Sequence, residues 1–224
     1  RAIVSVINDL STDQRVHKTC TTLHKLGYNV TLVGRRQRNS LPLETRTYSM
    51  KRMFLLFEKG PLFYAEYQLR LLLYLLFHKP NILISNDLDT LLPNYVISRI
   101  KSVPLVYDTH ELFCEVPELQ SNRIKKNIWK RIERWIFPKL KYIFTVNDSI
   151  AKIYSDEYHV PIKVVRNIPL YKPEAKQISK SDLNLPPDKK IIVLQGAGIN
   201  IDRGAEEAVE AMQYVNNAIL LIIG

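Results

Sequence analysis

The sequence has few cysteines and no long hydrophobic run, and each absence excludes a class of protein. Two cysteines, Cys20 and Cys114, occur among 224 residues. They stand far apart without metal-ligand spacing, so we expect no disulfide framework, no metal site and a reducing compartment. The most lipid-like stretch, residues 71–77, is far shorter than the roughly 20 residues of a membrane-spanning helix. No signal-peptide pattern is recognised, so we expect a cytoplasmic protein.

Charge of one sign predominates in the chain. Thirty-two Lys and Arg residues stand against 22 Asp and Glu residues, which gives a formal net charge of +10. This excess favours anionic partners such as nucleic acid, phosphorylated small molecules or an acidic membrane surface. Helix-turn-helix, zinc-finger and basic aromatic stacking patterns are not found, so we do not expect nucleic acid as a partner.

Short apolar segments alternate with longer segments of helical periodicity. Strands are predicted at residues 2–7, 29–34, 81–87, 103–109, 142–148 and 162–167. Helices are predicted between them at residues 14–27, 61–78, 88–101, 121–137 and 148–158. Strands that are apolar throughout and separated by helices indicate a doubly wound α/β fold with a parallel sheet covered on both faces. We expect this Rossmann-like domain over residues 1–167.

The remaining residues predict a linker and the beginning of a second domain. Residues 168–188 contain four prolines and no clear periodicity, which is typical of a linker. Residues 189–224 predict a strand at 190–198, a helix at 203–213 and a strand at 218–224. Two strands and one helix do not make an independent core. We therefore expect a Rossmann-like domain that this chain begins and does not complete.

Polar side chains follow the predicted strands where each strand ends. They include Asn8-Asp9, Asn86-Asp87, the segment 108–111 (Asp-Thr-His-Glu) and Asn147-Asp148. Doubly wound folds bind ligands at the carboxyl ends of their strands, so we expect these side chains to form one ligand-binding edge. Capping of the following helices is the alternative for Asp87 and Asn147. Capping requires neither His110 nor so many acids beside it.

Six segments in order resemble the GT-B glycosyltransferases of group 1 or family 4, which retain anomeric configuration and use nucleotide-sugar donors. They include D-Q-R-V at the first helix, V-Y-D-T-H-E after the strand at 103–109, and a strand leading to D-R-G near 203. The resemblance implies transfer of a sugar from a nucleotide-diphosphate sugar to an acceptor hydroxyl, without a metal or other cofactor. It further implies surface polysaccharide or glycolipid synthesis, with a sugar or lipid-linked acceptor.

The resemblance also implies a role for individual residues. His110 is the catalytic candidate, because the matching histidine faces the transferred sugar. The expected acceptor-binding residues are Asp13, Arg15, Asp87, Asp89 and Glu111. The expected donor-binding residues are Gly196, Gly198, Arg203 and Gly204.

Structural alternatives stand beside these roles. Arg15 could form a solvated salt bridge with Asp13, and Asp108 could cap a turn. Glu111 could orient His110. Gly196 and Gly198 could serve a tight strand-to-helix turn.

The chain departs from the family pattern at two points. The loop after the first strand contains no glycine, and the family's E-x7-E motif is not found, since Glu207 and Glu210 have the wrong spacing. We therefore expect this front portion to be inactive alone. A nucleotide-sugar epimerase of the same fold and a non-catalytic anion-binding or membrane-surface domain are the alternatives. The dinucleotide fingerprint is missing, so we do not expect NAD.

A basic helix at residues 122–137 offers two interpretations. Its isoleucines, at positions 124, 128, 132 and 136, are spaced four residues apart among many Lys and Arg residues. Such a helix could lie on an anionic membrane surface. It could equally pack its isoleucines on the sheet, which needs a covering helix here. The apolar segment 61–78 is a second candidate surface for membrane contact.

Overall fold

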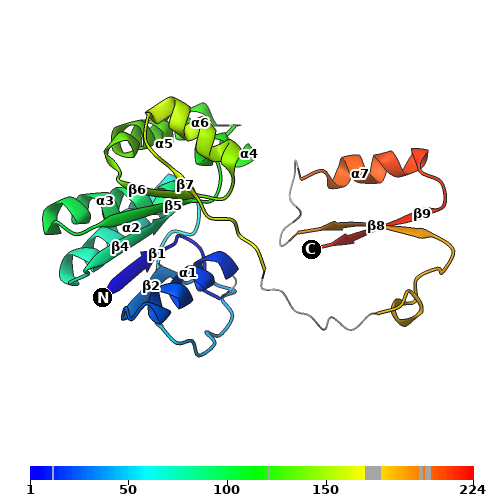
Figure 1. Ribbon diagram of the computed structural model, residues 1–224, viewed down its shortest axis with the longest axis horizontal. Coiled ribbons are helices and arrows are strands. Elements are labelled where there is room, and N and C mark those ends of the chain that lie inside the picture. Colours follow the sequence, from blue (N-terminus) through cyan, green and yellow to red (C-terminus); the bar gives the residue numbers. More distant parts are fainter. Residues whose placement is uncertain (12, 121, 170–177, 197–198, 200–202) are drawn as a thin grey trace. The chain divides into compact units, whose positions relative to one another are not determined.

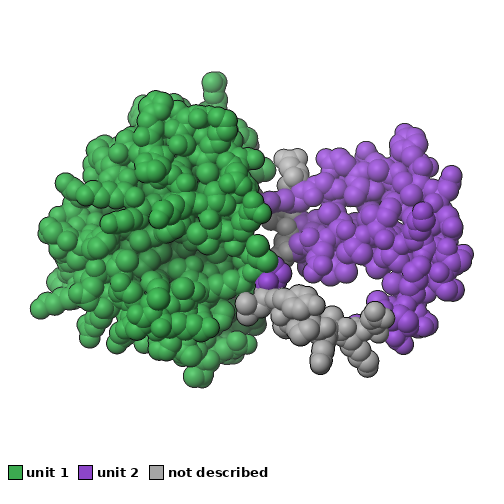
Figure 2. Space-filling view, viewed as in Figure 1, with its two compact units in different colours: residues 1–168 green, residues 169–224 purple. Residues whose placement is uncertain are grey.

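The computed structural model describes the whole chain except residues 12, 121, 170–177, 197–198 and 200–202. The chain divides into two compact units, Arg1–Ile168 and Pro169–Gly224, which Figure 2 colours green and purple. None of the described helices is long and apolar enough to cross a membrane.

The first unit is built on a seven-stranded parallel sheet with the order β3-β2-β1-β4-β5-β6-β7. The order reverses at β1, which pairs with β2 on one side and β4 on the other (Figure 1). The doubly wound fold is therefore confirmed. The strands are β1 (Ala2–Ser5), β2 (Val30–Arg35), β3 (Ser49–Met53), β4 (Ile82–Asn86), β5 (Leu105–Thr109), β6 (Tyr142–Thr145) and β7 (Lys163–Val164).

Helices cover both faces of this sheet. The helices are α1 (Gln14–Lys25), α2 (Gly60–Phe77), α3 (Leu88–Lys101), α4 (Pro117–Gln120), α5 (Arg123–Ile136) and α6 (Asp148–Tyr158), with short 3₁₀ turns at Phe113–Glu115 and Phe137–Lys139. The larger core joins one face of the sheet to side chains of α2, α3, α5 and α6. The smaller core joins the other face to Val16 and Cys20 of α1. Both cysteines are buried and free, as expected.

The strand β3 was not predicted from the sequence. Its residues, Ser-Met-Lys-Arg-Met, contain no apolar run, and burial alternates along them until Met53. The strand forms because β2 offers a parallel edge, with Thr31 opposite Ser49 and Arg35 opposite Met53. An edge strand needs only one buried row, so it lacks the continuous hydrophobicity on which the prediction relied.

The helix α5 packs through only part of its isoleucine row: Ile136 is buried in the larger core and Ile132 packs against that core. Ile124 is 76% exposed and Ile128 51% exposed, whereas Trp129, Glu133 and Ile136 are buried. Trp129 contacts the rings of Tyr64 and Phe113 edge-on, which buries more apolar surface than an isoleucine could.

Glu133 of α5 is fully buried, and its charge is compensated from two helices. The Glu133 carboxylate accepts a hydrogen bond from Lys130 Nζ at 2.7 Å. It also accepts one from Tyr158 Oη of α6 at 2.5 Å. A buried carboxylate needs such partners because its desolvation is otherwise unfavourable.

The second unit contains β8 (Lys190–Gln195), α7 (Ala205–Ala211) and β9 (Ala218–Ile223). The strands β8 and β9 pair in parallel, with Lys190 opposite Ala218. None of the described residues of this unit is buried, as expected for two strands and a helix without further layers. Glu207 and Glu210 are exposed on α7, in agreement with the sequence interpretation.

Gly34 of β2 allows the loop after β1 to lie against the sheet. A Cβ atom at Gly34 would stand 2.4 Å from Leu10 Cδ2 and 2.6 Å from the backbone oxygen of Asn8. The same oxygen accepts the N–H of Arg35 at 3.3 Å. Any side chain at Gly34 would therefore push this loop away from the ligand-binding edge.

We expect Gly34→Ala to destabilise the first unit by about 2 kcal/mol, the usual effect of overpacking a tight contact. Urea unfolding followed by circular dichroism measures the change. Gly196→Ala is the matched control, because a Cβ there meets its nearest neighbour only at 3.9 Å. Equal stability of the two variants would contradict this account.

Candidate functional site

Side chains from three distant segments meet at the carboxyl edge of the sheet, beside the point where the strand order reverses. Asp87 follows β4, Asp108 and His110 come from the end of β5 and the turn after it, and Arg15 comes from the first turn of α1. The parallel pairing of β4 with β5 sets Asn86 opposite Asp108, which brings both strand ends to one level. The expected cluster of polar residues is thus present in the first unit.

Asp87 adopts a backbone conformation that is rare for a residue with a side chain. Its φ is 59° and its ψ is 170°; such a conformation costs about 1–3 kcal/mol and is found mainly at functional sites. The Asp87 N–H donates to the backbone oxygen of Asp108 at 3.0 Å, which helps to hold the strained residue. The Asp87 side chain makes no capping hydrogen bond to α3. The capping interpretation was therefore wrong for Asp87, although Asn147 does cap α6 through Ile150 N.

Asp87 instead holds His110 through two contacts. Asp87 Oδ1 accepts the backbone N–H of His110 at 2.9 Å. Asp87 Oδ2 lies 3.2 Å from Nδ1 of the His110 ring. A carboxylate at Nδ1 fixes the ring orientation and leaves the other nitrogen, Nε2, for a different partner. Asp87, and not Glu111, is thus the residue that orients His110.

The Nε2 atom of His110 is buried and has no hydrogen-bond partner within the part of the chain that the structure describes. The nearest carboxylate oxygen, Asp108 Oδ2, is 3.7 Å away, which is too far for a hydrogen bond. Burial alone would lower the pKa of His110. The carboxylates of Asp108 and Asp87 outweigh that effect, so the pKa is raised above its ordinary value. His110 therefore presents an unsatisfied and readily protonated nitrogen.

The pKa of Asp87 is raised as well, to about 6, because burial disfavours its ionised form more than His110 stabilises it. The charge of each group therefore affects the protonation of the other. Such coupled groups with shifted pKa values are a common property of functional sites.

Arg15 forms its ion pair with Asp108 and not with Asp13. Its Nε donates to Asp108 Oδ2 at 3.2 Å, and its Nη2 binds Asp108 Oδ1. The side chain of Asp13 instead caps α1, accepting Val16 N at 3.0 Å. The expected Asp13–Arg15 salt bridge and the turn-capping role of Asp108 were both wrong. Burial raises the pKa of Asp108, but His110 and Arg15 outweigh it and the net shift is downward.

Asp9 forms a second charged cluster at the same edge, which sequence reasoning did not identify. Asp9 Oδ1 accepts Arg52 Nη2 at 2.6 Å, Ser11 N at 3.0 Å and Ser11 Oγ at 2.7 Å. Ser40 Oγ donates to the other oxygen. Burial alone would raise the pKa of Asp9, but these donors lower it to about 2. Arg52 belongs to β3, so the missing strand also concealed this cluster.

Two other predicted acceptor-binding residues differ sharply in exposure. Asp89 lies in the first turn of α3 and is buried, and its Oδ1 has no partner among the described residues. Burial and the charge of Asp87 raise the pKa of Asp89 well above its ordinary value. Glu111 is exposed, and only its backbone oxygen is bound, by Thr109 Oγ1 at 2.9 Å and Tyr154 Oη at 3.2 Å.

A buried hydrogen-bond network that joins β1, β4 and α3 supports the site. Asn86 Nδ2 donates to the Ser5 backbone oxygen at 2.9 Å, joining β4 to β1. Thr90 Oγ1 donates to the backbone oxygen of Asn86 at 2.8 Å, and Asn94 Nδ2 donates to the backbone oxygen of Thr90 at 2.8 Å. The four-residue spacing of Asn86, Thr90 and Asn94 is a sequence signal that could have revealed this network.

The predicted donor-binding residues belong to the second unit. Gly196 follows β8, Arg203 is exposed, and Gly204 precedes α7 with a φ of +81°. Gly198 lies outside the described residues. A left-handed conformation at Gly204 favours glycine, so its identity has a local structural cause. Among the described residues no group of three His, Cys, Asp or Glu side chains could hold a metal ion.

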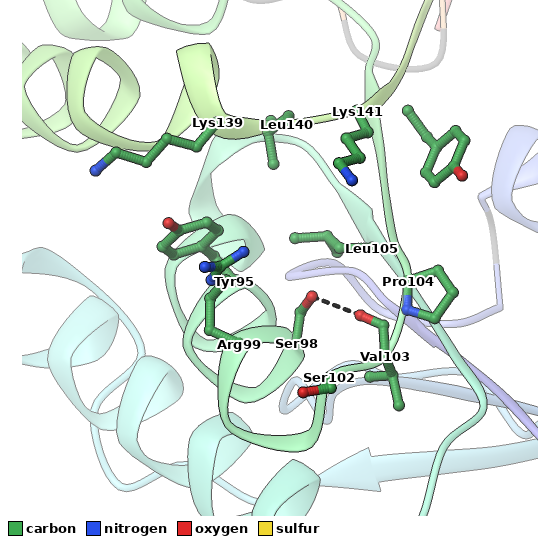
Figure 3. A pocket seen from close by; sticks show the side chains of 11 residues that line it. Tyr95, Ser98, Arg99, Ser102, Val103, Pro104, Leu105, Lys139, Leu140 and Lys141 are labelled. Atoms are coloured by element: carbon green, nitrogen blue, oxygen red, sulfur yellow. Dashed lines mark hydrogen bonds between the residues drawn. The ribbon is translucent and has the colours of Figure 1, made fainter.

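Two hollows of the first unit differ in their place on the sheet: the first lies along the face that α1 covers, and the second lies at the amino ends of strands. One, of about 360 Å³, lies beside Arg15, Lys18 and Asp108 and is otherwise largely apolar. Another, of about 430 Å³, lies at the amino ends of β5 and β6 (Figure 3). Arg99, Lys139 and Lys141 project around that second hollow, far along the strands from His110. Only the first hollow adjoins the cluster described above.

Comparison with known proteins gives one family and one fold. The model of Glycosyltransferase Family 4 matches residues 13–169. No curated protein sequence matches significantly. Sucrose-phosphate synthase from Thermosynechococcus elongatus is 17% identical with a TM-score of 0.74, and covers 100% of this chain and 62% of its own. The chain thus spans about three fifths of that protein.

Other solved structures share the fold at lower identity. HepE from Anabaena, solved with UDP and glucose, is 13% identical with a TM-score of 0.64 over 99% of this chain and 60% of its own. UDP-N-acetylglucosamine 2-epimerase from Rickettsia bellii is 10% identical with a TM-score of 0.58, over 100% and 62%. The fold is accordingly that of the GT-B glycosyltransferases.

We expect Asp87→Asn to lower the pKa of His110, because a neighbouring negative charge is removed while the shape is kept. The pKa is read from the imidazole NMR signals during a pH titration. Asp148→Asn, at an exposed aspartate paired only with Arg166, is the control. An unchanged His110 pKa in Asp87→Asn would show that this carboxylate does not govern the ring.

We expect Asp9 to contribute stability that is present above pH 3.8 and lost as the pH falls toward about 2, because its folded-state pKa is lowered from 3.8 to about 2. Asp9→Asn should lower the free energy of unfolding by about 2 kcal/mol at neutral pH. It should also flatten the acid limb of the stability curve. Thermal unfolding between pH 2 and neutrality, compared with the exposed-site variant Asp156→Asn, measures both effects. Parallel curves for the two variants would refute the assignment.

Proposed function

Because the chain belongs to Glycosyltransferase Family 4, we propose that its first unit is the acceptor-side domain of a retaining glycosyltransferase. The reaction moves a sugar from a nucleotide-diphosphate sugar to an acceptor hydroxyl. The bond between the anomeric carbon and the diphosphate oxygen breaks, and a bond to the acceptor oxygen forms. The acceptor proton leaves with the nucleotide diphosphate. We assign no metal or other cofactor to this step.

One observation carries the proposal: at the carboxyl edge of the sheet, His110 presents a buried nitrogen that has no partner among the described residues. A buried polar atom is unfavourable unless something binds it, and a sugar hydroxyl is a suitable ligand. Asp87 orients the ring from Nδ1, and its strained backbone places both residues. When protonated, His110 donates a hydrogen bond from Nε2 to the sugar and offsets the negative charge that the leaving diphosphate gains.

The surrounding charges suit an acceptor that offers hydroxyl groups. Asp108 is engaged by Arg15, and Asp9 is engaged by Arg52. Glu111 is exposed beside His110 and can accept hydrogen bonds from acceptor hydroxyls. We also assign to the acceptor side Asp13, Arg15, Asp87 and Asp89. The first three support the site through their structural contacts.

The donor belongs to the second unit in this proposal. Gly196, Gly198, Arg203 and Gly204 would surround the diphosphate, since Arg203 supplies a cation and the glycines permit close approach of the backbone. Support comes from HepE and from Os79 of O. sativa, both solved with UDP. UDP is accordingly the first nucleotide to test. The acceptor is a sugar or a lipid-linked sugar, for surface polysaccharide or glycolipid synthesis at the inner face of the plasma membrane.

Epimerisation of a nucleotide sugar is the second candidate, since an epimerase from Rickettsia bellii shares the fold. Family membership favours transfer. The two reactions differ in their products: transfer releases the nucleotide diphosphate, whereas epimerisation keeps it bound to the sugar. A chromatographic assay of the nucleotide products therefore separates them.

We expect His110→Asn to reduce sugar transfer at least 100-fold in the protein expressed from its complete natural gene. The asparagine side chain is shorter than the imidazole that donates a hydrogen bond to the sugar, and it cannot carry a positive charge. Release of UDP from a panel of UDP-sugars, with bacterial glycolipid extract as acceptor, measures the effect. His159→Asn is the matched control: His159 has a left-handed conformation that asparagine tolerates, and it caps α6 far from the site. Equal activity in both variants would show that His110 has no part in the mechanism. Isomerisation of the UDP-sugar without release of UDP would favour the epimerase reaction.

A further inference from the structure

The helix α2 is apolar on two faces, and only one of them is used by the core. Its buried row consists of Phe63, Tyr67, Leu71 and Leu75. Another row of large apolar side chains is exposed along the whole helix: Leu62 59%, Leu69 56%, Leu73 43%, Leu76 41% and Phe77 81%. A helix that is apolar all round is normally buried in a protein or in lipid. The exposed row, called here the α2 stripe, therefore requires an explanation.

The loop before α2 extends this stripe. Phe54, Leu56 and Phe57 are all exposed. Glu66 of α2 fixes the loop, because its carboxylate accepts Leu56 N at 2.8 Å and Phe57 N at 3.0 Å. Glu66 also pairs with Arg70 at 2.7 Å. The one carboxylate that α2 carries is thus neutralised, and its bonds hold three apolar side chains of the loop beside the stripe.

Basic residues stand at both ends of the α2 stripe. A hollow of about 330 Å³ at its amino end is lined by Arg36, Arg38 and Lys59, with Glu58 as its carboxylate. Glu58 is paired with Arg38 at 2.8 Å. Arg36 and Lys59 are exposed and have no acidic partner in the described part of the chain. Lys79 is exposed just beyond the carboxyl end of the stripe.

We propose that the α2 stripe docks on a lipid bilayer that contains anionic phospholipids, with lipid phosphate groups in the basic hollow. Leucine and phenylalanine side chains flanked by cations are the combination that places a helix in the interface of an anionic membrane. Charge argues against a second copy of the chain as the occupant. In an antiparallel two-fold contact, the basic amino end of one α2 would face the basic carboxyl end of the other, which is unfavourable.

The helix α5, the other basic candidate, is less suited to this contact. Lys126 is engaged by Glu115 at 2.7 Å. Lys130 is engaged by Glu133 and Glu157 at 2.7 Å and 2.8 Å. Its exposed apolar residues are also fewer, with Ile124, Ile128 and Trp135 on its surface. Arg123, Lys125 and Arg131 of α5 have no acidic partner in the described part of the chain, so α5 is less suited because it exposes fewer large apolar side chains than α2 and its loop do.

Docking through α2 would also orient the site. The basic hollow is formed by the segments that follow β2 and β3, so it opens at the same carboxyl edge of the sheet as His110. The membrane surface would then lie beside the edge to which an acceptor binds. Bilayer binding itself requires no catalysis, so this inference can stand or fall independently of the proposed transferase activity.

Co-sedimentation with vesicles tests the proposal. The intact chain is mixed with vesicles of phosphatidylcholine alone and of phosphatidylcholine with phosphatidylglycerol. We expect binding to the anionic vesicles only, and at least a tenfold loss of affinity for Leu69→Gln/Leu73→Gln and for Arg36→Glu/Lys59→Glu. Because all four side chains are exposed, both variants should keep the native circular dichroism and unfolding temperature.

Matched controls distinguish binding through the α2 stripe from nonspecific electrostatic or hydrophobic binding. Lys139→Glu/Lys141→Glu changes the net charge equally at the opposite edge of the sheet, and Ile124→Gln/Ile128→Gln removes exposed apolar side chains from α5. Both should bind as the unaltered chain does. Equal losses in test and control pairs, or no loss in the α2 pairs, would overturn the proposal. Sedimentation equilibrium showing a dimer that only Leu69→Gln/Leu73→Gln disrupts would overturn it in favour of a second copy.

Discussion

The parallel pairing of β1 with both β2 and β4 is the constraint on which the rest of the first unit depends. Ala2 stands opposite Val30 on one side and Ile82 on the other, so the chain must leave these strands toward different faces of the sheet. The helix α1 packs on one face and α3 on the other, and the carboxyl edge between them stays open to a ligand. The contacts of Arg15 with Asp108 and of Asp87 with His110 follow from this arrangement, because no local segment holds these residues together.

Charge at this edge is almost fully balanced within the protein, although the chain as a whole is strongly basic. Arg15 compensates Asp108, Arg52 compensates Asp9, and His110 faces Asp87. Within the described residues, three buried nitrogens of these groups have no hydrogen-bond partner: Nε2 of His110, Nη1 of Arg15 and Nε of Arg52. The upward pKa shifts of Asp87 and His110 have opposite causes: burial raises the pKa of Asp87 against the effect of His110, whereas the carboxylates of Asp108 and Asp87 raise the pKa of His110 against the effect of burial.

The sequence was sufficient for the elements that are continuously apolar and insufficient for those that depend on a neighbour. The strands around the strand-order reversal and the ends that carry Asp87 and His110 were predicted, because burial on both faces makes their hydrophobicity unmistakable. The pairing of Arg15 with Asp108 could not be predicted, because 93 residues separate them in the sequence. The packed face of α5 was predicted only in part, because isoleucine spacing gave no weight to the rings around Trp129. The ion pair of Asp9 with Arg52 was not predicted, because Arg52 lies on the strand that has no apolar run.

That strand, β3, ends the sheet on one side and leaves its outer row of backbone N–H and C=O groups without a neighbouring strand. Ser49 and Lys51 are exposed on it, and Arg52 is half-buried. An edge that carries Lys51 and Arg52 and has no β-branched residue is a weak template for a strand from another molecule. The scarcity of hydrophobic residues that concealed β3 in the sequence therefore protects the folded protein from aggregation through edge-to-edge growth of its sheet.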